Sequence, residues 1–249
     1  MTKFKLTQTA LKELEDFLIC PKHWYEKWIK KTFKTEPNIH MLRGSYFEYL
    51  AIGAGATDDA VTDLPRLKKD DKKSISQIRI EEQAEKFKSL FSPDSPDFLG
   101  YHIGNIQIHL STDSEKGTLD FDCATPDGEE AIVDLKLTGD IFNPHGKWHP
   151  LTRDEVDYLQ QVHYQNLWFK NKGSRPPAFM AVFDYSTKKN WTFFEVEITE
   201  ADVAEVEERF IKGHEQIKAM KPTKVSPSDG YCAKCPLKCN WRIAEYEAS

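Results

Sequence analysis

The chain has 249 residues, a length that favours one large domain. Its hydrophobic residues (39%) and aromatic residues (12%) suffice for a sizeable core, which excludes a wholly disordered chain. The formal net charge of -6 at pH 7 excludes nucleic-acid binding through overall basicity, although not through a local positive groove. No apolar run approaches the roughly 18 residues of a membrane span, and the N-terminus lacks the apolar core of a signal peptide. We therefore expect a cytoplasmic protein with no membrane partner.

The N-terminal third indicates helices separated by polar segments. Thr7 or Thr9 can cap a first helix with a regular apolar face. Further helices are expected over 42–50 and 78–90. The segment Lys27–Lys34 interleaves lysines with aromatic residues. It can contact phosphates and stack bases, or it can form an amphipathic helix that packs its aromatics inward.

From Tyr101 the apolar residues recur with a period of two, which is typical of strands. The elements expected from here on are strands around 103–110, 119–123 and 133–137, a helix over 154–170, strands at 178–183 and 191–198, and a helix over 200–220. This order favours an α/β fold with a mixed, mainly antiparallel sheet flanked by helices, rather than a doubly wound parallel sheet.

The turn Pro126-Asp-Gly128 joins two of these strands, and its length decides which side chains share a face. A two-residue loop would place Asp120 opposite Leu135 and so put a carboxylate on the apolar face. A loop of odd length avoids this conflict, and because a one-residue slip turns every side chain over, burial selects the odd loop. The residues then expected on the apolar face are Leu119, Phe121, Cys123, Val133, Leu135 and Leu137, with Asp120, Asp122, Asp134 and Lys136 on the other.

The odd register brings Asp120 beside Asp134 and Lys136, which are two residues apart on one strand. Two carboxylates suit Mg²⁺, which favours oxygen ligands and keeps several waters. Lys136 could orient a metal-bound water or help to deprotonate it. The alternative is a salt-bridged strand surface without chemistry.

Four segments resemble, in the same order, the motifs of the PD-(D/E)xK nuclease superfamily in its RecB-like branch. They are Gly44-Ser-Tyr-Phe-Glu48, Gly117-Thr-Leu-Asp120, Ile132-Val-Asp-Leu-Lys-Leu-Thr-Gly139 and Gln160-Gln-Val-His-Tyr164. The resemblance implies a restriction-endonuclease-like core and hydrolysis of DNA. Two positions depart from the usual pattern, since Glu48 stands where histidine is common and Leu137 where threonine follows the lysine.

The resemblance also implies a role for each side chain. Glu48, Asp120 and Asp134 would bind Mg²⁺ or Mn²⁺ together with the carbonyl of Leu135, and Lys136 would orient or deprotonate the attacking water. Gln160 and Tyr164 are neighbours on one helix face and would position the DNA backbone or the lysine. Gln161 could take the role of Gln160.

The five cysteines indicate a metal site rather than disulfides. Cys232, Cys235 and Cys239 supply three thiolates, and zinc or an iron–sulfur cluster would each want a fourth ligand. Cys20 is the better candidate, because Cys123 falls among apolar strand residues and suits a core position. His23 and His214 could replace a thiolate but are interpreted as surface residues.

The four cysteines outside the strand resemble those of the iron–sulfur nucleases, such as AddB-type subunits and CRISPR adaptation nucleases. The segment from Phe17 to Tyr25 is similar to their F-x-x-C-P-x-x-x-Y opening. The resemblance implies a [4Fe-4S] cluster that joins residues 1–40 and 221–249 around the core 41–220 of one nuclease domain. The spacing before the last cysteine departs from that pattern, so structural Zn²⁺ is the alternative.

These observations together predict a divalent-metal-dependent deoxyribonuclease. We expect an exonuclease that acts on single strands or duplex ends, in recombination, repair or phage DNA processing. A processive role would need a helicase or recombination partner, or a homo-oligomer, since the chain carries no helicase motor. The alternative is a catalytically inactive nuclease-like module that binds DNA or a protein within a larger assembly.

Overall fold

The computed structural model describes residues 4–16, 20–53, 61–64, 72–152, 156–221 and 237. The chain divides into two compact units, one of residues 1–36 with 204–249 and one of residues 37–203. Within the described ranges no helix is long and apolar enough to cross a membrane. The expectation of one domain closed by its two ends stays a prediction.

The first unit contains α1 (Gln8–Glu15), α2 (Pro21–Tyr25), a short π-helix η1 (Glu26–Lys30) and most of α6 (Glu200–Ala219). Thr7 is the N-cap of α1, as expected, because its hydroxyl accepts a backbone N–H of the first turn at 3.2 Å. Helices α1 and α6 pack closely, since a Cβ on Gly213 would lie only 2.7 Å from Leu11. Arg209 on α6 also donates two hydrogen bonds to Glu15 on α1.

The lysine-rich segment of the first unit is held by local ion pairs. The ammonium of Lys27 and the indole N–H of Trp28 both bond to Glu13, at 2.5 and 2.7 Å. Lys30 pairs with Glu26. These contacts favour the amphipathic alternative for this segment over a surface that binds phosphates.

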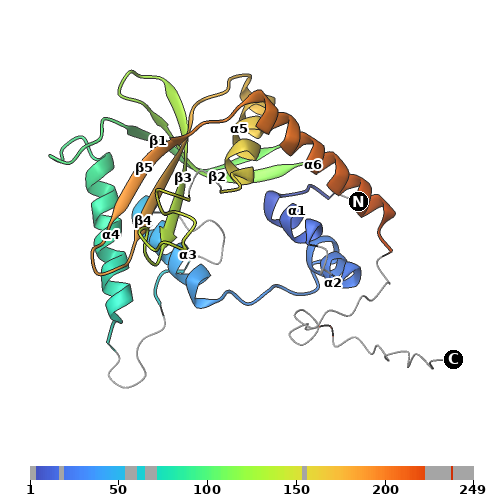
Figure 1. The fold of residues 1–249 in the computed structure, drawn as a ribbon, viewed down its shortest axis with the longest axis horizontal. Helices are drawn as coiled ribbons and strands as arrows, with labels where there is room; N and C mark the ends of the chain where they lie inside the picture. Colours follow the sequence, from blue (N-terminus) through green and yellow to red (C-terminus); the bar gives the residue numbers. More distant parts are fainter. Residues whose placement is uncertain are drawn as a thin grey trace. The chain divides into compact units, whose positions relative to one another are not determined.

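The second unit is built on one five-stranded sheet (Figure 1). Its elements are α3 (Ile39–Ile52), α4 (Ile75–Phe91), β1 (His102–Ser111), β2 (Lys116–Ala124), β3 (Glu130–Thr138), α5 (Leu159–Lys172), β4 (Ala178–Asp184) and β5 (Trp191–Val196). The strands follow one another in chain order, and only β3 and β4 run parallel. The prediction of a mixed, mainly antiparallel sheet flanked by helices is confirmed.

Helix α5 provides the crossover that the parallel pair β3–β4 requires. It begins at Leu159, five residues later than the sequence predicted. The carboxylate of Asp157 accepts the N–H of Leu159 at 2.9 Å, which satisfies a backbone donor of the first turn.

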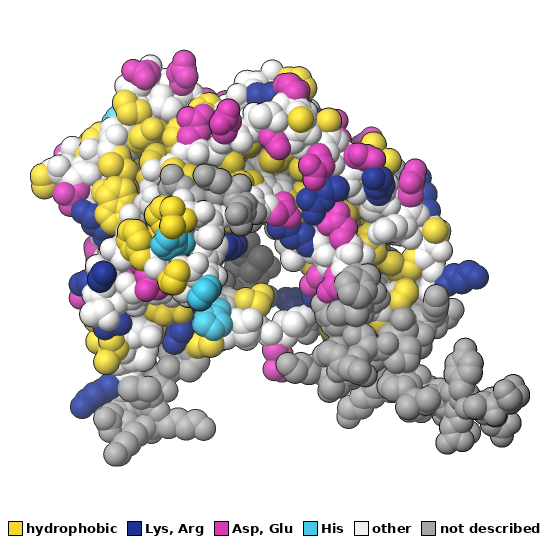
Figure 2. All heavy atoms as spheres, in the orientation of Figure 1, with side chains coloured by type: hydrophobic (Ala, Val, Ile, Leu, Met, Phe, Trp, Pro, Cys, Tyr) yellow, Lys and Arg dark blue, Asp and Glu magenta, His cyan; other side chains and the backbone are white. Residues whose placement is uncertain are grey.

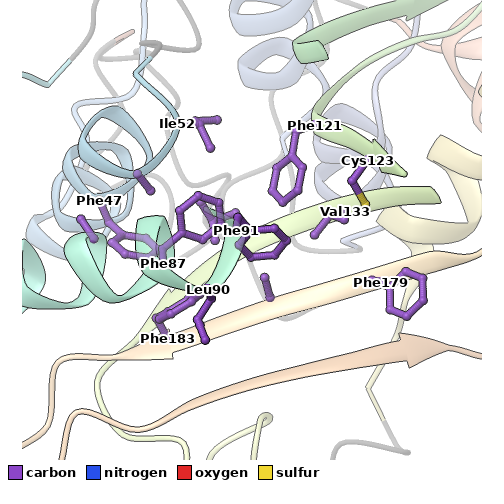
Figure 3. Packing of buried hydrophobic residues seen from close by; sticks show 14 of the residues in the cluster. Phe47, Ile52, Phe87, Leu90, Phe91, Phe121, Cys123, Val133, Phe179 and Phe183 are labelled. Atoms are coloured by element: carbon purple, nitrogen blue, oxygen red, sulfur yellow. The ribbon is translucent and has the colours of Figure 1, made fainter. Parts of the chain in front are cut away.

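Two hydrophobic clusters hold the helices to the sheet. One joins α3 and α4 to the sheet through aromatic rings in tilted and edge-to-face contacts, which Figure 3 shows meeting at Phe47, Phe87, Phe91, Phe121 and Phe183. The other joins α5 to the opposite face through Leu110, Leu119, Ile132, Leu167 and Trp168. Burial on both faces explains why β4, which lies between β3 and β5, is apolar from Ala178 to Phe183.

The pairing of β2 with β3 confirms the predicted odd register, because Phe121 lies opposite Val133. Thr125 donates to the carbonyl of Glu129 at 2.8 Å, so the loop consists of three residues, 126–128. Gly128 has a φ of 84°, the left-handed conformation that ends a three-residue hairpin loop at least cost for glycine.

One expectation about the faces is wrong, because Leu119 packs with the α5 cluster and not with Phe121. The change of side occurs at Asp120, beyond the last backbone pair of β2 with β3. Across the ladder from Asp120, between the pairs Ile106–Phe121 and Ile108–Leu119, stands Gln107. Its φ of 51° is unusual for a side-chain-bearing residue and breaks the strand alternation at this level.

Candidate active site

The site forms where β2 and β3 part, and the Asp134 carboxylate lies at its centre. Asp134 is 2% exposed. One of its oxygens is 2.6 Å from the ammonium of Lys136, and the other accepts a 2.8 Å hydrogen bond from the amide of Gln160. The Gln160 amide also donates to the hydroxyl of Tyr164 at 3.0 Å. Side chains from β3 and α5 thus form one continuous polar network.

Asp120 reaches the same place from β2. Its carboxylate accepts the backbone N–H of Leu135 at 2.7 Å, in the position that a strand carbonyl would otherwise occupy. Burial and the nearby charge of Asp134 raise the pKa of Asp120 well above its ordinary value. Two carboxylates therefore converge where one positive charge, on Lys136, opposes their repulsion.

Lys136 is held as a cation in this arrangement. Burial disfavours its charged form, but the charges of Asp134 and Asp120 outweigh that effect and raise the pKa of Lys136. An ammonium with a raised pKa is a poor proton acceptor. The geometry therefore supports the first of the two predicted roles, orienting a water or a phosphate oxygen, over deprotonation.

Glu48 comes to the site from α3, on the other side of the sheet. Burial raises the pKa of Glu48, while the charge of Lys136 lowers it and that of Asp134 raises it. These mutual effects place Glu48 within electrostatic range of the strand residues. The structure therefore brings all six side chains predicted for the catalytic site into one region, and their chemical roles stay predictions.

Gly117 explains how two of the sequence segments fit together. A Cβ at this position would lie 2.6 Å from the ring of Tyr164 and 3.2 Å from the side chain of Leu167. Only glycine lets α5 approach β2 this closely. The glycine three residues before Asp120 therefore sets the position of Tyr164, and with it that of Gln160.

The choice between the two adjacent glutamines is resolved by their contacts. Gln161 is 4% exposed, and its amide contacts the sulfur of Met180 at 2.8 Å in the core. Gln160 faces Asp134 instead. Gln160 is therefore the glutamine of the site.

The candidate site offers two carboxylate ligands to a hard divalent cation such as Mg²⁺, but no complete set of protein ligands among the described residues. Among the described residues, no group of three or more His, Cys, Asp and Glu side chains is arranged to hold a metal ion. The buried carboxylates of Asp120 and Asp134 nevertheless lie close enough for the charge of Asp134 to raise the pKa of Asp120. Mg²⁺ commonly binds through only one or two carboxylates, with waters and phosphate as its other ligands. The donor set therefore fits Mg²⁺ or Mn²⁺ at Asp120 and Asp134, beside the backbone of Leu135, and a part for Glu48 stays a prediction.

Of the four cysteines predicted to bind a metal cluster, only Cys20 lies among the described residues. Cys20 is buried. Cys232, Cys235 and Cys239 lie outside the described residues, so the iron–sulfur or zinc site stays a prediction. Cys123 is a core residue, as expected, and burial raises the pKa of its thiol to about 12, which makes it a poor metal ligand.

The sequence analysis missed several residues near the site. Gln107 stands across from Asp120, and both polar atoms of its side chain are buried without a hydrogen-bond partner among the described residues. Tyr185 and Lys147 line a pocket just beyond the end of β3. A positive φ at a glutamine and a pocket formed by loops leave no periodic signal in a sequence.

Comparison with known proteins supports a nuclease-like fold. No protein-family model and no curated protein matches the chain. A crystal structure of a "Putative exonuclease" from Eubacterium rectale matches 97% of this chain and 91% of its own, with a TM-score of 0.63 and 20% identity. The structure of SSO0001 matches 96% and 87%, with a TM-score of 0.37 and 11% identity, too low to support an inference. The mixed sheet flanked by helices is therefore a fold shared with the "Putative exonuclease" from Eubacterium rectale.

Proposed function

We propose that the protein is a divalent-metal-dependent deoxyribonuclease that hydrolyses phosphodiester bonds, most specifically an exonuclease. The observation that carries this proposal is the network of Asp120, Asp134, Lys136 and Gln160 at the point where β2 and β3 part. The fold shared with a protein named as an exonuclease supports it.

Each side chain of the candidate site has its own role in the hydrolysis of a phosphodiester bond. A water oxygen attacks phosphorus, the bond from phosphorus to one sugar oxygen breaks, and that oxygen leaves with a proton. The ammonium of Lys136 orients the water or a phosphate oxygen and stabilises the negative charge that develops there. Gln160 holds Asp134, and Tyr164 holds Gln160. A bound Mg²⁺ or Mn²⁺ would supply water activation and charge neutralisation at Asp120 and Asp134.

The test is cleavage of end-labelled single-stranded and duplex DNA by the purified protein with Mn²⁺ or Mg²⁺. We expect products in both metals, none in EDTA, and at least a hundredfold loss of rate in Lys136→Ala. Lys88→Ala serves as the control, because Lys88 lies on α4 and pairs with Glu85, outside the Asp134 network. Equal rates for wild type and Lys136→Ala would overturn the catalytic assignment.

DNA substrates with closed or blocked ends test whether the protein is an exonuclease. An exonuclease should degrade a linear strand and spare a closed circle, and a block at the 5′ or 3′ end should reveal the polarity. Cutting of the circle would replace the exonuclease assignment with an endonuclease. Binding of DNA without cleavage in either metal would favour the inactive module.

We also propose a metal site that joins the ends of the chain through Cys20, Cys232, Cys235 and Cys239, as a [4Fe-4S] cluster or alternatively Zn²⁺. The close packing of α1 against α6 through Gly213 supports the proximity of the two ends. Anaerobic purification with iron, sulfide and zinc analysis tests it. Broad visible absorbance that is lost in Cys20→Ser would support the cluster, and a protein free of both metals would contradict the site.

A further inference from the structure

We infer that a pocket at the ends of β3 and β4 binds one unpaired nucleotide of the DNA strand, an inference that rests on the proposed function. The pocket has a volume of about 250 Å³. Its lining consists of His40, Leu137, Thr138, Gly139, Lys147, Trp148 and Tyr185.

The pocket adjoins the candidate active site along β3. Thr138 lies two residues after Lys136, a distance of about 7 Å along a strand. The N–H of Tyr185 donates to the carbonyl of Thr138 at 3.2 Å, which fixes the aromatic residue beside the end of β3. A strand whose phosphate lies at Lys136 can therefore place a neighbouring nucleotide at Tyr185.

The lining combines aromatic rings with positive charge. The ammonium of Lys147 lies 4.3 Å from the centre of the Trp148 ring. The guanidinium of Arg43 lies 5.0 Å from the centre of the Tyr185 ring and donates to its hydroxyl at 3.1 Å. None of the described residues that line the pocket carries a carboxylate. Rings for a base and cations for a phosphate are the combination with which proteins hold single-stranded nucleic acid.

Hydrophobic side chains near the pocket add to the surface on which bases could stack. Figure 2 shows hydrophobic and histidine side chains side by side over α3 and the loop that follows β3. On these segments, Met41 of α3 is 55% exposed and Phe142 of the loop is 51% exposed, although both are large apolar residues. Exposed apolar side chains next to a basic pocket suit the faces of unpaired bases.

The size of the pocket selects an unpaired base. Its volume lies below the roughly 300–1,000 Å³ of pockets for drug-sized ligands, so it admits one base and not a base pair. A base inside a duplex would first have to leave its stack and its partner, at a cost in free energy. The pocket therefore predicts a preference for single strands or frayed ends.

Fluorescence of 2-aminopurine tests the pocket without cleavage. Single-stranded oligonucleotides carry the probe at one position at a time and are bound by the full-length protein in EDTA. We expect quenching of several-fold at one position from the end and little at the others. Tyr185→Leu should abolish that quenching and weaken binding about tenfold, whereas Tyr185→Phe should keep the quenching. Phe169→Leu is the matched control, an exposed ring under a cation that lies outside the pocket lining.

The outcomes separate the pocket from the proposed function. Equal quenching at every position, or position-specific quenching that survives in a folded Tyr185→Leu variant, would overturn the pocket. Metal-dependent cleavage would still support the nuclease in that case. Position-specific quenching that depends on Tyr185, in a protein that cuts nothing with Mn²⁺, would instead support the pocket and overturn the nuclease.

Discussion

The carboxylate of Asp184 accepts a hydrogen bond of 3.1 Å from the backbone N–H of Ile141, and so joins the end of β4 to the loop that follows β3. Asp184 is fully buried. Its oxygens also accept two hydrogen bonds each from Ser186 and Asn190. One side chain therefore organises the two segments that carry Tyr185 and Lys147 to the pocket.

Replacing Asp184 should destabilise the second unit strongly. In Asp184→Ala five donors lose their acceptor, and we expect the free energy of unfolding to fall by about 3 kcal/mol or more. Urea denaturation followed by circular dichroism measures the change. Asp97→Ala, which removes an exposed ion pair with Lys86, should have a much smaller effect. Similar midpoints for the two variants would contradict this role for Asp184.

Substitution of Gln160 should reduce catalysis, whereas substitution of the adjacent Gln161 should reduce stability. Gln160→Ala removes the hydrogen bond to Asp134, and we expect a ten- to hundredfold loss of cleavage rate with little change in melting temperature. Gln161→Ala removes a buried contact to Met180 and should lower the melting temperature while activity per folded molecule persists. Steady-state cleavage and thermal unfolding of both variants measure this split. The reverse pattern would assign the role to Gln161.

Gly117→Ala should impair activity through steric displacement. The new methyl group would meet the Tyr164 ring at 2.6 Å, so the ring must move and take its contact with Gln160 along. We expect a cleavage rate at least tenfold lower in a protein that still folds, with a loss of about 1–3 kcal/mol in stability. Gly44→Ala is the control, because a Cβ there meets nothing within 4 Å. An unchanged rate in Gly117→Ala would show that the position of Tyr164 is unimportant.

Asp120→Asn should stabilise the metal-free protein while it abolishes cleavage. The amide oxygen still accepts the N–H of Leu135, but the repulsion of Asp134 is removed. We expect the melting temperature in EDTA to rise by roughly 2–4 °C. Mn²⁺ should raise the melting temperature of the wild type more than that of the variant. A lower melting temperature for the variant in EDTA would show that the Asp120 carboxylate stabilises the fold.

His163 should make the protein sensitive to acid. It is fully buried, and burial together with the charge of Lys170 lowers its pKa from 6.5 to about 4, although a bond to the Lys116 carbonyl acts in the opposite direction. Below pH 6.5 the unfolded chain takes up a proton that the folded protein excludes, so stability falls as the pH drops towards 4. The loss attributable to His163 should reach about 3 kcal/mol.

The comparison of wild type with His163→Gln isolates this contribution. Urea denaturation between pH 7 and pH 4 should give a shallower decline for the variant, since glutamine takes up no proton in this range. If stability declined equally with pH in the two proteins, His163 would be taking up its proton as readily in the folded state as in the unfolded state.

The sequence predicted the parts of the site that periodicity controls. The odd register, in which Phe121 and Val133 share a face, followed from alternation, because a slipped register would bury Asp120 against the α3 cluster. The spacing of Gln160 and Tyr164 was enough to place both on one helix face. These features depend on neighbours in the chain, which a sequence displays directly.

The remaining features depend on contacts between distant segments. The left-handed conformation of Gln107 is rare for a residue with a side chain, so the change of side at Leu119 could not be foreseen. Tyr185 and Lys147 come from two loops whose meeting is decided by Asp184, a residue without a repeating pattern. Residues at such junctions carry no periodic signal even where they lie beside the site.

The three-residue turn at 126–128 has a consequence for how this chain can change. A longer loop could still join the same pair, Thr125 and Glu129, so residues added to the turn would leave Asp134 on its present face. A residue added or lost inside β2 or β3 would instead turn Asp134 to the face that Val133 now occupies. Natural variants that keep this chemistry should therefore differ in length within the turn and not within the two strands that it joins.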